Sequence, residues 1–307
     1  LKHSAQRRWQ DQNRGKTRVV VQIGHCSQAV GATKIAETLA KSLPENTYLI
    51  TAGCDGSCYD SVQVVLTEPS GFQHRYSRVT PKSATQIATE ISSGSLSGES
   101  ENVSFFDKQR RVTLDLCGQI DATNIDDYIL HGGYAGLARA LDMSADQVVD
   151  EVKESKLQGR GGAYFPTAVK WQGARAIDNE PRYLIVNSEE GEPGIFKDRH
   201  LMEGVAHRII EGAIIASYAS GVHEAYIYIN AEANLSAQRM LDAVELAYDN
   251  ALLGENILES GYNLSITIRR GAGGYVCGEE TTLINTMEGY RREPRLKPPF
   301  PTESGLW

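Results

Sequence analysis

The 307-residue sequence predicts an α/β protein built from two domains in series. Three observations support this prediction. In the first ninety residues, strand-like and helix-like apolar patterns alternate along the chain. In the second part, strand patterns run directly into glycine-rich or acidic loops. Between the two parts lies the Ser/Gly-rich segment 92–100, whose composition is typical of a linker, and we place the linker at 93–106.

The N-terminal domain, predicted to span residues 17–92, shows the element order β-α-β followed by β-β-α. This is the thioredoxin-like arrangement, and its first β-α-β unit implies two parallel strands. Thr80 and Pro81 predict a helix start, with a hydroxyl at the N-cap and proline at the first helical position. Residues 1–16 form a basic arm, which is typical of a disordered or subunit-docking tail. The predicted elements are strands 19–23, 47–52, 62–67 and 75–79 and helices 32–43 and 81–91.

Three cysteines of this domain follow its first two strands. Cys26 comes after the first strand, and Cys54 and Cys58 come after the second. Because parallel strands end at the same sheet edge, we expect the three thiols to converge.

The cysteine spacing resembles that of the thioredoxin-like [2Fe-2S] ferredoxins, the 24-kDa partner subunit of complex I. Their pattern is Cys-x4-Cys followed by Cys-x3-Cys, and the second position is Gly31 here. The resemblance implies a [2Fe-2S] cluster, which takes four ligands, usually thiolates. His25 is adjacent to Cys26, but adjacent side chains on a strand diverge, so we expect the fourth ligand from elsewhere in the chain or from another subunit. The alternative is a degenerate domain kept as a docking surface. The remaining cysteines, Cys117 and Cys277, are interpreted as buried structural thiols.

The C-terminal domain carries three loops with the character of a binding site. GRGGAYFPTAVKW at 159–171 has glycines around an arginine, whose amides can approach a phosphate or a ring, and Lys170 adds a positive charge. NSEEGEPG at 187–194 follows a buried strand, and GAGGYVCGEE at 271–280 opens a helix. Each loop alone also fits an ordinary surface turn, but three together favour a ligand site. The predicted elements are strands 183–187 and 263–269, a helix begun by the capping box of Ser144 and Gln147, and a helix after residue 280.

These three loops, in this order, resemble the flavoprotein (51-kDa) subunit of respiratory complex I. The same subunit type occurs in soluble NAD-linked hydrogenases, NAD-dependent formate dehydrogenases and electron-bifurcating enzymes. The family pattern continues with KPPFP at 297–301 and GLW at 305–307. The resemblance covers residues 107–307. It departs at Tyr164, where the family has glycine, and at Glu189, where it has aspartate.

The resemblance implies an α/β FMN-binding domain that oxidises NADH and passes single electrons to iron–sulfur clusters of a multisubunit oxidoreductase. The flavin carries the chemistry, so no residue is expected to act as a general acid or base. A [4Fe-4S] cluster is expected only in the family's region beyond residue 307. The implied NADH-binding residues are Phe165, Glu192, Lys297 and Phe300, with Phe300 stacking on adenine. The implied FMN-binding residues are Gly159, Arg160, Gly161, Gly162, Lys170, Asn187, Glu189, Glu190, Tyr275, Gly278, Glu279 and Glu280.

Composition narrows the class of protein. With 31 basic and 39 acidic residues, the net charge of −8 argues against nucleic acid or an anionic membrane as partner. No apolar run approaches the ~18 residues of a membrane span. Five cysteines in 307 residues do not suggest a secreted disulfide framework, so we expect a cytoplasmic protein, peripheral to a membrane complex if bound to one. Because the chain begins with Leu1 and stops before the family's cluster region, we expect it to be a piece of a longer protein.

Two other functions stay open on the sequence. A scaffold subunit with a decayed flavin site would explain the bulky Tyr164 and would bind no flavin. A hydrolase could use the carboxylates of Glu189, Glu190 and Glu192 with a divalent metal, and its turnover would depend on that metal.

Overall fold

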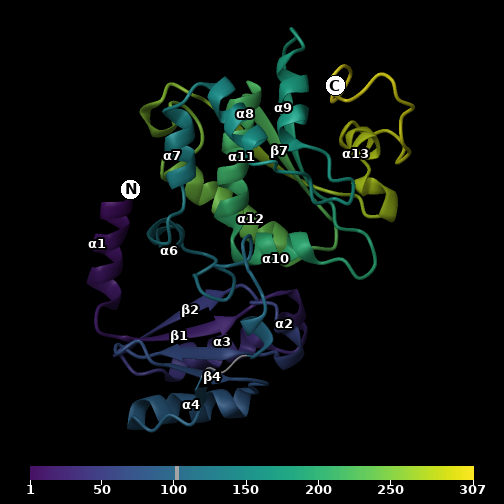
Figure 1. The fold of residues 1–307 in the computed structure, drawn as a ribbon. Helices are drawn as coiled ribbons and strands as arrows, with labels where there is room; N and C mark the ends of the chain where they lie inside the picture. The colour runs from purple at the N-terminus through teal and green to yellow at the C-terminus, as the bar shows by residue number, and fades with distance from the viewer. Residues whose placement is uncertain (101–103) are drawn as a thin grey trace. The chain divides into compact units, whose positions relative to one another are not determined.

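The computed structural model describes residues 1–100 and 104–307 (Figure 1). The chain forms two compact units. Unit 1 contains Leu1–Gly132 and the segment Arg199–Ala206, and unit 2 contains Gly133–Asp198 and His207–Trp307. The division therefore falls after the predicted linker 93–106, part of which, 101–103, lies outside the described residues. Among the described helices, none combines the length and the apolar composition that crossing a membrane requires.

Unit 1 is built on a five-stranded mixed sheet of order β2-β1-β3-β4-β5. The predicted parallel pair is confirmed, with β1 and β2 in register from Thr17 opposite Thr47 to Gln22 opposite Ala52. The predicted strand 62–67 corresponds to β3, which pairs antiparallel with β4, and β4 covers 73–76 where the sequence predicted 75–79. The strands are β1 (Thr17–Gln22), β2 (Thr47–Ala52), β3 (Val64–Thr67), β4 (Gln73–Tyr76) and β5 (Glu99–Ser100). The helices are α1 (Lys2–Asn13), α2 (His25–Ala29), α3 (Ala32–Ser42), α4 (Pro81–Ser93), α5 (Ser104–Asp107) and α6 (Ile125–Leu130), with a short 3₁₀ turn η1 (Cys58–Asp60).

The centre of the unit 1 sheet is buried on both sides. Val19, Val20 and Val21 of β1 are all at most 2% exposed, as expected for a central strand. The cap predicted for α4 is confirmed, because the Thr80 hydroxyl accepts the amide of Ser83 at 3.2 Å. This framework holds the ends of β1 and β2 in place, and the cysteines follow those ends.

Two segments of unit 1 differ from the sequence prediction. The basic arm was expected to be a disordered or docking tail, but Lys2–Asn13 forms helix α1, with Ala5 fully buried. Arg8 donates two hydrogen bonds to Asp126 of α6, at 2.6 and 2.5 Å, which anchors the helix. Within the predicted linker, β5 adds an edge strand to β4, so this segment is partly ordered.

Unit 2 is built on a three-stranded parallel sheet of order β6-β7-β8. Its central strand, β7, is almost completely buried and was not among the predicted elements. The strands are β6 (Tyr183–Ser188), β7 (Glu224–Ile229) and β8 (Ser265–Arg270). The helices are α7 (Ala135–Leu141), α8 (Ala145–Glu154), α9 (Thr167–Arg175), α12 (Asn234–Asp249) and α13 (Glu280–Met287), with 3₁₀ turns η2 (Ile257–Glu259) and η3 (Tyr275–Gly278). Helix α10 (Lys197–Gly204) lies mostly in the segment that belongs to unit 1, whereas α11 (Ala206–Ser220) begins at the last residue of that segment and continues in unit 2.

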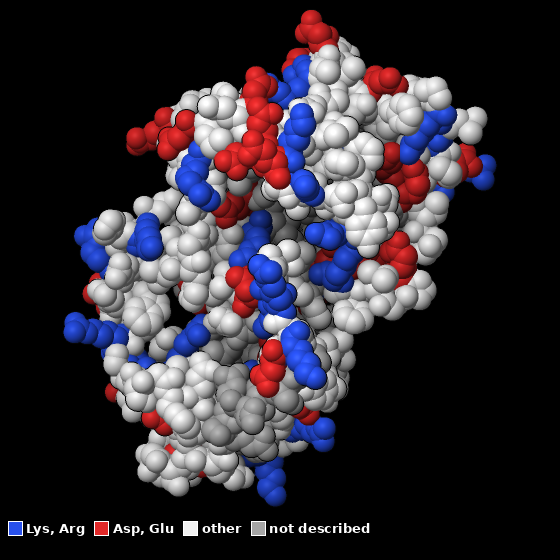
Figure 2. Space-filling view, viewed as in Figure 1, with Lys and Arg blue, Asp and Glu red and all other residues white. Residues whose placement is uncertain are grey.

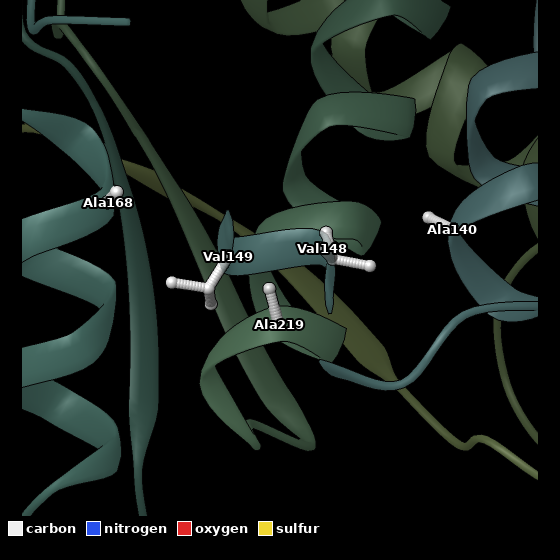
Figure 3. Packing of buried hydrophobic residues seen from close by; sticks show 5 residues of the cluster. All are labelled: Ala140, Val148, Val149, Ala168 and Ala219. Carbon is white, nitrogen blue, oxygen red and sulfur yellow. The ribbon is translucent and has the colours of Figure 1, made fainter. Parts of the chain in front are cut away.

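The helices around the unit 2 sheet pack through small and branched side chains. One apolar cluster joins α7, α8, α9 and α11 (Figure 3). The predicted capping box of α8 is confirmed, because Ser144 accepts the amide of Gln147 and Gln147 accepts that of Ser144. On the face shown in Figure 2, acidic and basic side chains are interspersed. The cluster members are Ala140, Val148, Val149, Ala168 and Ala219.

Candidate functional site

The three parallel strands of unit 2 end level with one another. Ser188, Ile229 and Arg270 are opposite each other in the sheet register. The next residue after each strand therefore reaches the same edge, which is where open α/β sheets bind ligands. These next residues are Glu189, Asn230 and Gly271.

Glu189 lies at the centre of this edge. Its side chain is buried, and its Oε1 accepts a hydrogen bond of 2.6 Å from the Asn230 amide. Its Oε2 is also buried and has no hydrogen-bond partner among the described residues. Burial raises the pKa of this carboxyl, and the nearby Glu192 and Glu232 add to the effect. A buried acceptor without a donor is a place for a hydroxyl or N–H group of a ligand.

Gly271 packs directly against Glu189. A Cβ at this position would lie 2.5 Å from Glu189 Oε2 and 3.1 Å from the Tyr228 ring. A side chain is therefore excluded here by contact, and the loop backbone approaches the carboxylate closely.

The second and third loops are in contact with each other. The Asn187 side chain donates a hydrogen bond of 2.8 Å to the carbonyl of Gly278. A Cβ on Gly278 would lie 3.3 Å from the carbonyl oxygen of Glu189, and one on Gly191 would lie 3.5 Å from that of Gly274. The second and third loops are thus packed directly against each other.

A cluster of four charged side chains joins the first loop to the later segments. Lys170, on α9, has its Nζ 3.6 Å from Glu280. Lys297 Nζ lies 2.5 Å from Glu280 and 3.3 Å from Glu279. The hydrogen bond to Glu280 raises the pKa of Lys297, so this side chain is firmly cationic. Two lysines held at one place are suited to an anionic ligand group.

The carboxylates of Glu279 and Glu280 have different hydrogen-bond and ion-pair partners. Glu279 is the N-cap of α13, because its Oε2 accepts the amides of Thr281 and Thr282 at 2.9 and 2.8 Å. Burial acts to raise the pKa of Glu279, but these hydrogen bonds and the one from Lys297 outweigh it, and the pKa is lowered. Glu280 is engaged by lysines alone in the contacts above. A helix-capping role therefore accounts for Glu279 without any ligand.

The first loop is a tight hairpin closed by the Gly159 amide, which donates to the carbonyl of Phe165 at 2.9 Å. Its tip is exposed to solvent. Tyr164 has a φ of +51°, a left-handed conformation that favours glycine. This is the physical reason for glycine at this position in the family pattern, and the Tyr164 ring itself is 58% exposed.

The remaining predicted residues of unit 2 divide into exposed and buried ones. Glu190 is buried, and its Oε1 accepts the amide of Asp198 at 2.7 Å near the start of α10. The exposed ones are Arg160, Gly161, Gly162, Phe165, Glu192, Tyr275 and Phe300.

A second group of chemically active side chains lies in unit 1. Cys54 and Cys58 have their sulfur atoms 3.7 Å apart. Together with His200 of α10, each offers a donor atom within 4.8 Å of the other two. Cys26 is beside Cys58, and burial together with that neighbouring thiol raises its pKa. This arrangement is a candidate metal site, and the expected convergence of thiols is seen directly for Cys54 and Cys58.

Two contributors to these sites were missed from the sequence. Asn230 follows β7, a strand that was not predicted, although a predicted strand there would have pointed to it. His200 lies 142 positions after Cys58 in the sequence, and no local pattern links the two.

The carboxyl edge of a parallel sheet thus carries a buried carboxylate with a glycine against it, which makes this edge a candidate ligand site of an α/β protein. The profile of the Nuo51 FMN-binding domain matches residues 152–307, just over half of the chain. The chain therefore belongs to the Nuo51 FMN-binding family.

Individual relatives agree with this assignment. An NADH-quinone oxidoreductase subunit of Aquifex aeolicus is 52% identical over 185 residues, which cover 60% of this chain and 43% of that protein. The HndC subunit of the NADP-reducing hydrogenase of Solidesulfovibrio fructosivorans is 48% identical over 200 residues, covering 65% and 41%. The fold is similar to a crystal structure of an NAD⁺-reducing [NiFe]-hydrogenase in the H₂-reduced state, with a TM-score of 0.52 and 22% identity over 94% of this chain and 49% of that chain. The chain thus spans less than half the length of each of these relatives.

Proposed function

We propose that unit 2 binds FMN at the edge formed by Glu189, Asn230 and Gly271, and that the flavin exchanges a hydride with NAD(H). The observation that carries this proposal is the buried, donor-free oxygen of Glu189 against Gly271, inside the segment that matches the FMN-binding family. Electrons would then leave singly for iron–sulfur clusters of a multisubunit oxidoreductase. The names of the relatives, which describe components of an NADH-quinone oxidoreductase and of a hydrogenase, support this assignment.

The residues present fit FMN. Because the Gly159 amide closes the hairpin, residues 160–162 at its exposed tip would offer their amides to the phosphate, together with the Lys170 ammonium. Glu189 offers its free oxygen to a ribityl hydroxyl or a ring N–H, and Asn187, Glu190 and Gly278 shape the adjacent loops. When bound, the flavin supplies two-electron acceptance with single-electron release. FMN is favoured over FAD because the sequence contains no second mononucleotide-binding half for an adenine tail.

NADH is proposed to bind over the same site. Glu192 is exposed and can hydrogen-bond a ribose or the nicotinamide amide, and its charge would repel the extra phosphate of NADPH. Phe300 offers a half-exposed ring for adenine stacking, and Phe165, the other aromatic residue that we assign to NADH, is half-exposed as well. Lys297 is paired with Glu279 and Glu280 when no ligand is bound, so a dinucleotide phosphate would compete with these carboxylates for it.

The test of this function is the flavin content of the purified chain after incubation with FMN. We expect one FMN per chain by visible absorbance and by mass spectrometry of the released cofactor, and NADH should bleach the flavin absorbance. A folded chain that takes up no flavin would support the scaffold alternative, and release of FAD would contradict the choice of cofactor.

Unit 1 has a separate proposed role. We propose that it is a thioredoxin-like domain whose cysteines hold a [2Fe-2S] cluster that accepts electrons one at a time. The mixed sheet and the donor group at Cys54, Cys58 and His200 support this proposal. The amounts of iron and acid-labile sulfide bound by the chain test this proposal directly, whether or not flavin is bound.

A further inference from the structure

We propose that His200 is the fourth protein ligand of the [2Fe-2S] cluster, together with Cys26, Cys54 and Cys58. The inference rests on the cluster proposed for unit 1 and does not depend on FMN. It identifies which residue of this chain replaces the thiolate that Gly31 cannot provide.

The donor atoms are close enough to share one metal centre. The sulfurs of Cys54 and Cys58 are 3.7 Å apart, close to the edge of a tetrahedron whose metal–sulfur bonds measure about 2.3 Å. Two thiolates on one iron have this spacing. A ring nitrogen of His200 is within 4.8 Å of both sulfurs. Cys26 is a direct neighbour of Cys58. These four side chains would hold the cluster.

Helix α10 is fixed in place beside the thiols. Gly204 packs on Gly53 so closely that a Cβ on Gly53 would lie 2.3 Å from the Gly204 Cα. The buried Glu203 accepts the backbone amide of His25 at 2.9 Å, next to Cys26. Both contacts involve the residue just before a cysteine, since Gly53 precedes Cys54 and His25 precedes Cys26. The position of His200 is therefore determined by the packing of the helix that carries it.

The backbone carbonyl of His200 also makes a contact that fixes its position. This carbonyl accepts a contact of 3.6 Å from the Cys117 sulfur, and Cys117 is buried. Gly204 touches the same sulfur, because a Cβ there would lie 2.8 Å from it. Cys117, which the sequence left as an isolated structural thiol, thus supports the segment that carries the proposed ligand.

The donor set has a chemical consequence. Three thiolates and one neutral imidazole give the centre one negative charge fewer than four thiolates would. Replacing thiolate by histidine raises the reduction potential of a [2Fe-2S] centre, as in centres with two histidines. Cluster binding would displace protons from the thiols, because the ligand form of cysteine is the thiolate.

The experiment uses the full 307-residue chain, reconstituted with iron and sulfide, and compares His200→Cys and His200→Ala with the unchanged protein. We expect about two irons per chain, an EPR signal on reduction, and ¹⁴N hyperfine coupling from a ligating imidazole in pulsed EPR. His200→Cys should keep the iron, lose the ¹⁴N ligand coupling and shift the reduction potential downward. His200→Ala should lose most of the cluster.

His25→Ala is the matched control, because His25 is adjacent to Cys26 and its side chain is exposed. This variant should keep the iron, the ¹⁴N coupling and the potential. The proposal is overturned if His25→Ala removes the coupling, if His200→Ala keeps the wild-type spectrum and iron content, if the chain takes up one zinc in place of the cluster, or if Cys54 and Cys58 form a disulfide and bind no iron. FMN content measured on the same samples separates failure of this inference from failure of the flavin proposal.

Discussion

Gly271 shows how one missing side chain shapes the candidate flavin site. Its backbone lies where any Cβ would overlap the Glu189 carboxylate. Glu189 cannot easily move away, because it is buried and bound to Asn230. The φ angle of Gly271 lies outside the left-handed region, so backbone conformation does not require glycine here. The lack of space for a Cβ atom does.

Gly271→Ala should therefore displace Glu189, destabilise unit 2 by about 1–3 kcal/mol and strongly reduce FMN binding. Denaturant unfolding and FMN titration followed by flavin fluorescence measure both effects. The matched control is Gly173→Ala on α9, where a Cβ would meet no atom within 4 Å and alanine favours the helix. Equal FMN affinity in the two variants would contradict the proposed site.

Because folding raises the pKa of Glu189, this carboxyl makes the free energy of unfolding depend on pH in a defined direction. The folded state holds this proton more tightly than the unfolded state does, so the contribution of Glu189 falls as pH rises from the ordinary value of 4.5 through the folded pKa. Glutamine does not ionise, so Glu189→Gln should not lose stability as pH rises. Relative to the unchanged protein, we expect the variant to gain in free energy of unfolding as pH rises through the folded pKa of Glu189. Urea unfolding of both proteins from about pH 4 to 8 measures this difference in free energy of unfolding. A difference that does not change with pH would contradict the prediction.

Phe300 is the residue on which the proposed adenine contact depends. Base-on-aromatic stacking is worth roughly 1–3 kcal/mol, so Phe300→Ala in an intact enzyme should raise the KM for NADH about five- to a hundredfold. Flavin content should not change, and Glu192→Gln should narrow the preference for NADH over NADPH. If Phe300→Ala leaves NADH kinetics untouched and lowers thermal stability, the 297–301 segment is only a rigid connector.

At the scale of elements, helix α13 links the third loop to the rest of unit 2. Its N-terminal amides are bound by Glu279, whose other oxygen faces Lys297. The loop, the helix start and the KPPFP segment therefore share one side chain. Loss of that side chain should affect all three.

Glu279→Ala should lower stability by about 1 kcal/mol, as expected for loss of an N-cap, and should also weaken FMN binding because the third loop loses its anchor at the start of α13. Thr80→Ala removes the cap of α4 in unit 1 and is the control, with a similar stability loss and unchanged FMN affinity. Urea unfolding and flavin titration distinguish the two. Unchanged flavin affinity in Glu279→Ala would assign Glu279 to helix capping alone.

At the scale of the whole molecule, the two units carry different candidate cofactors. A ligand stabilises only the part that binds it, by about 2.7 kcal/mol at a hundredfold excess over Kd. Calorimetry should therefore show two unfolding transitions, with FMN raising only that of unit 2 and cluster reconstitution raising only that of unit 1. The mutant Gly271→Ala should lose the FMN shift and keep the cluster shift. A single transition that both cofactors raise equally would contradict independent sites.

Much of the framework could be predicted from the sequence because it depends on local signals. The strand β2, the parallel pairing with β1, and the caps at Thr80 and Ser144 follow from periodicity and from hydroxyls that precede helices. The first helix and β7 were missed. Helix α1 depends on a distant partner, Asp126, and β7 carries no loop motif that would attract notice.

The sequence by itself determined the family, the three loops and the candidate residues within them, because those residues are contiguous and their spacing is distinctive. Only the tertiary structure decided which of them meet. It placed Glu189 against Gly271 and Asn230, gave Glu279 to a helix start, and brought His200 to Cys54 and Cys58. These contacts join residues far apart in the chain, and they depend on strand register and helix packing, which no local pattern encodes.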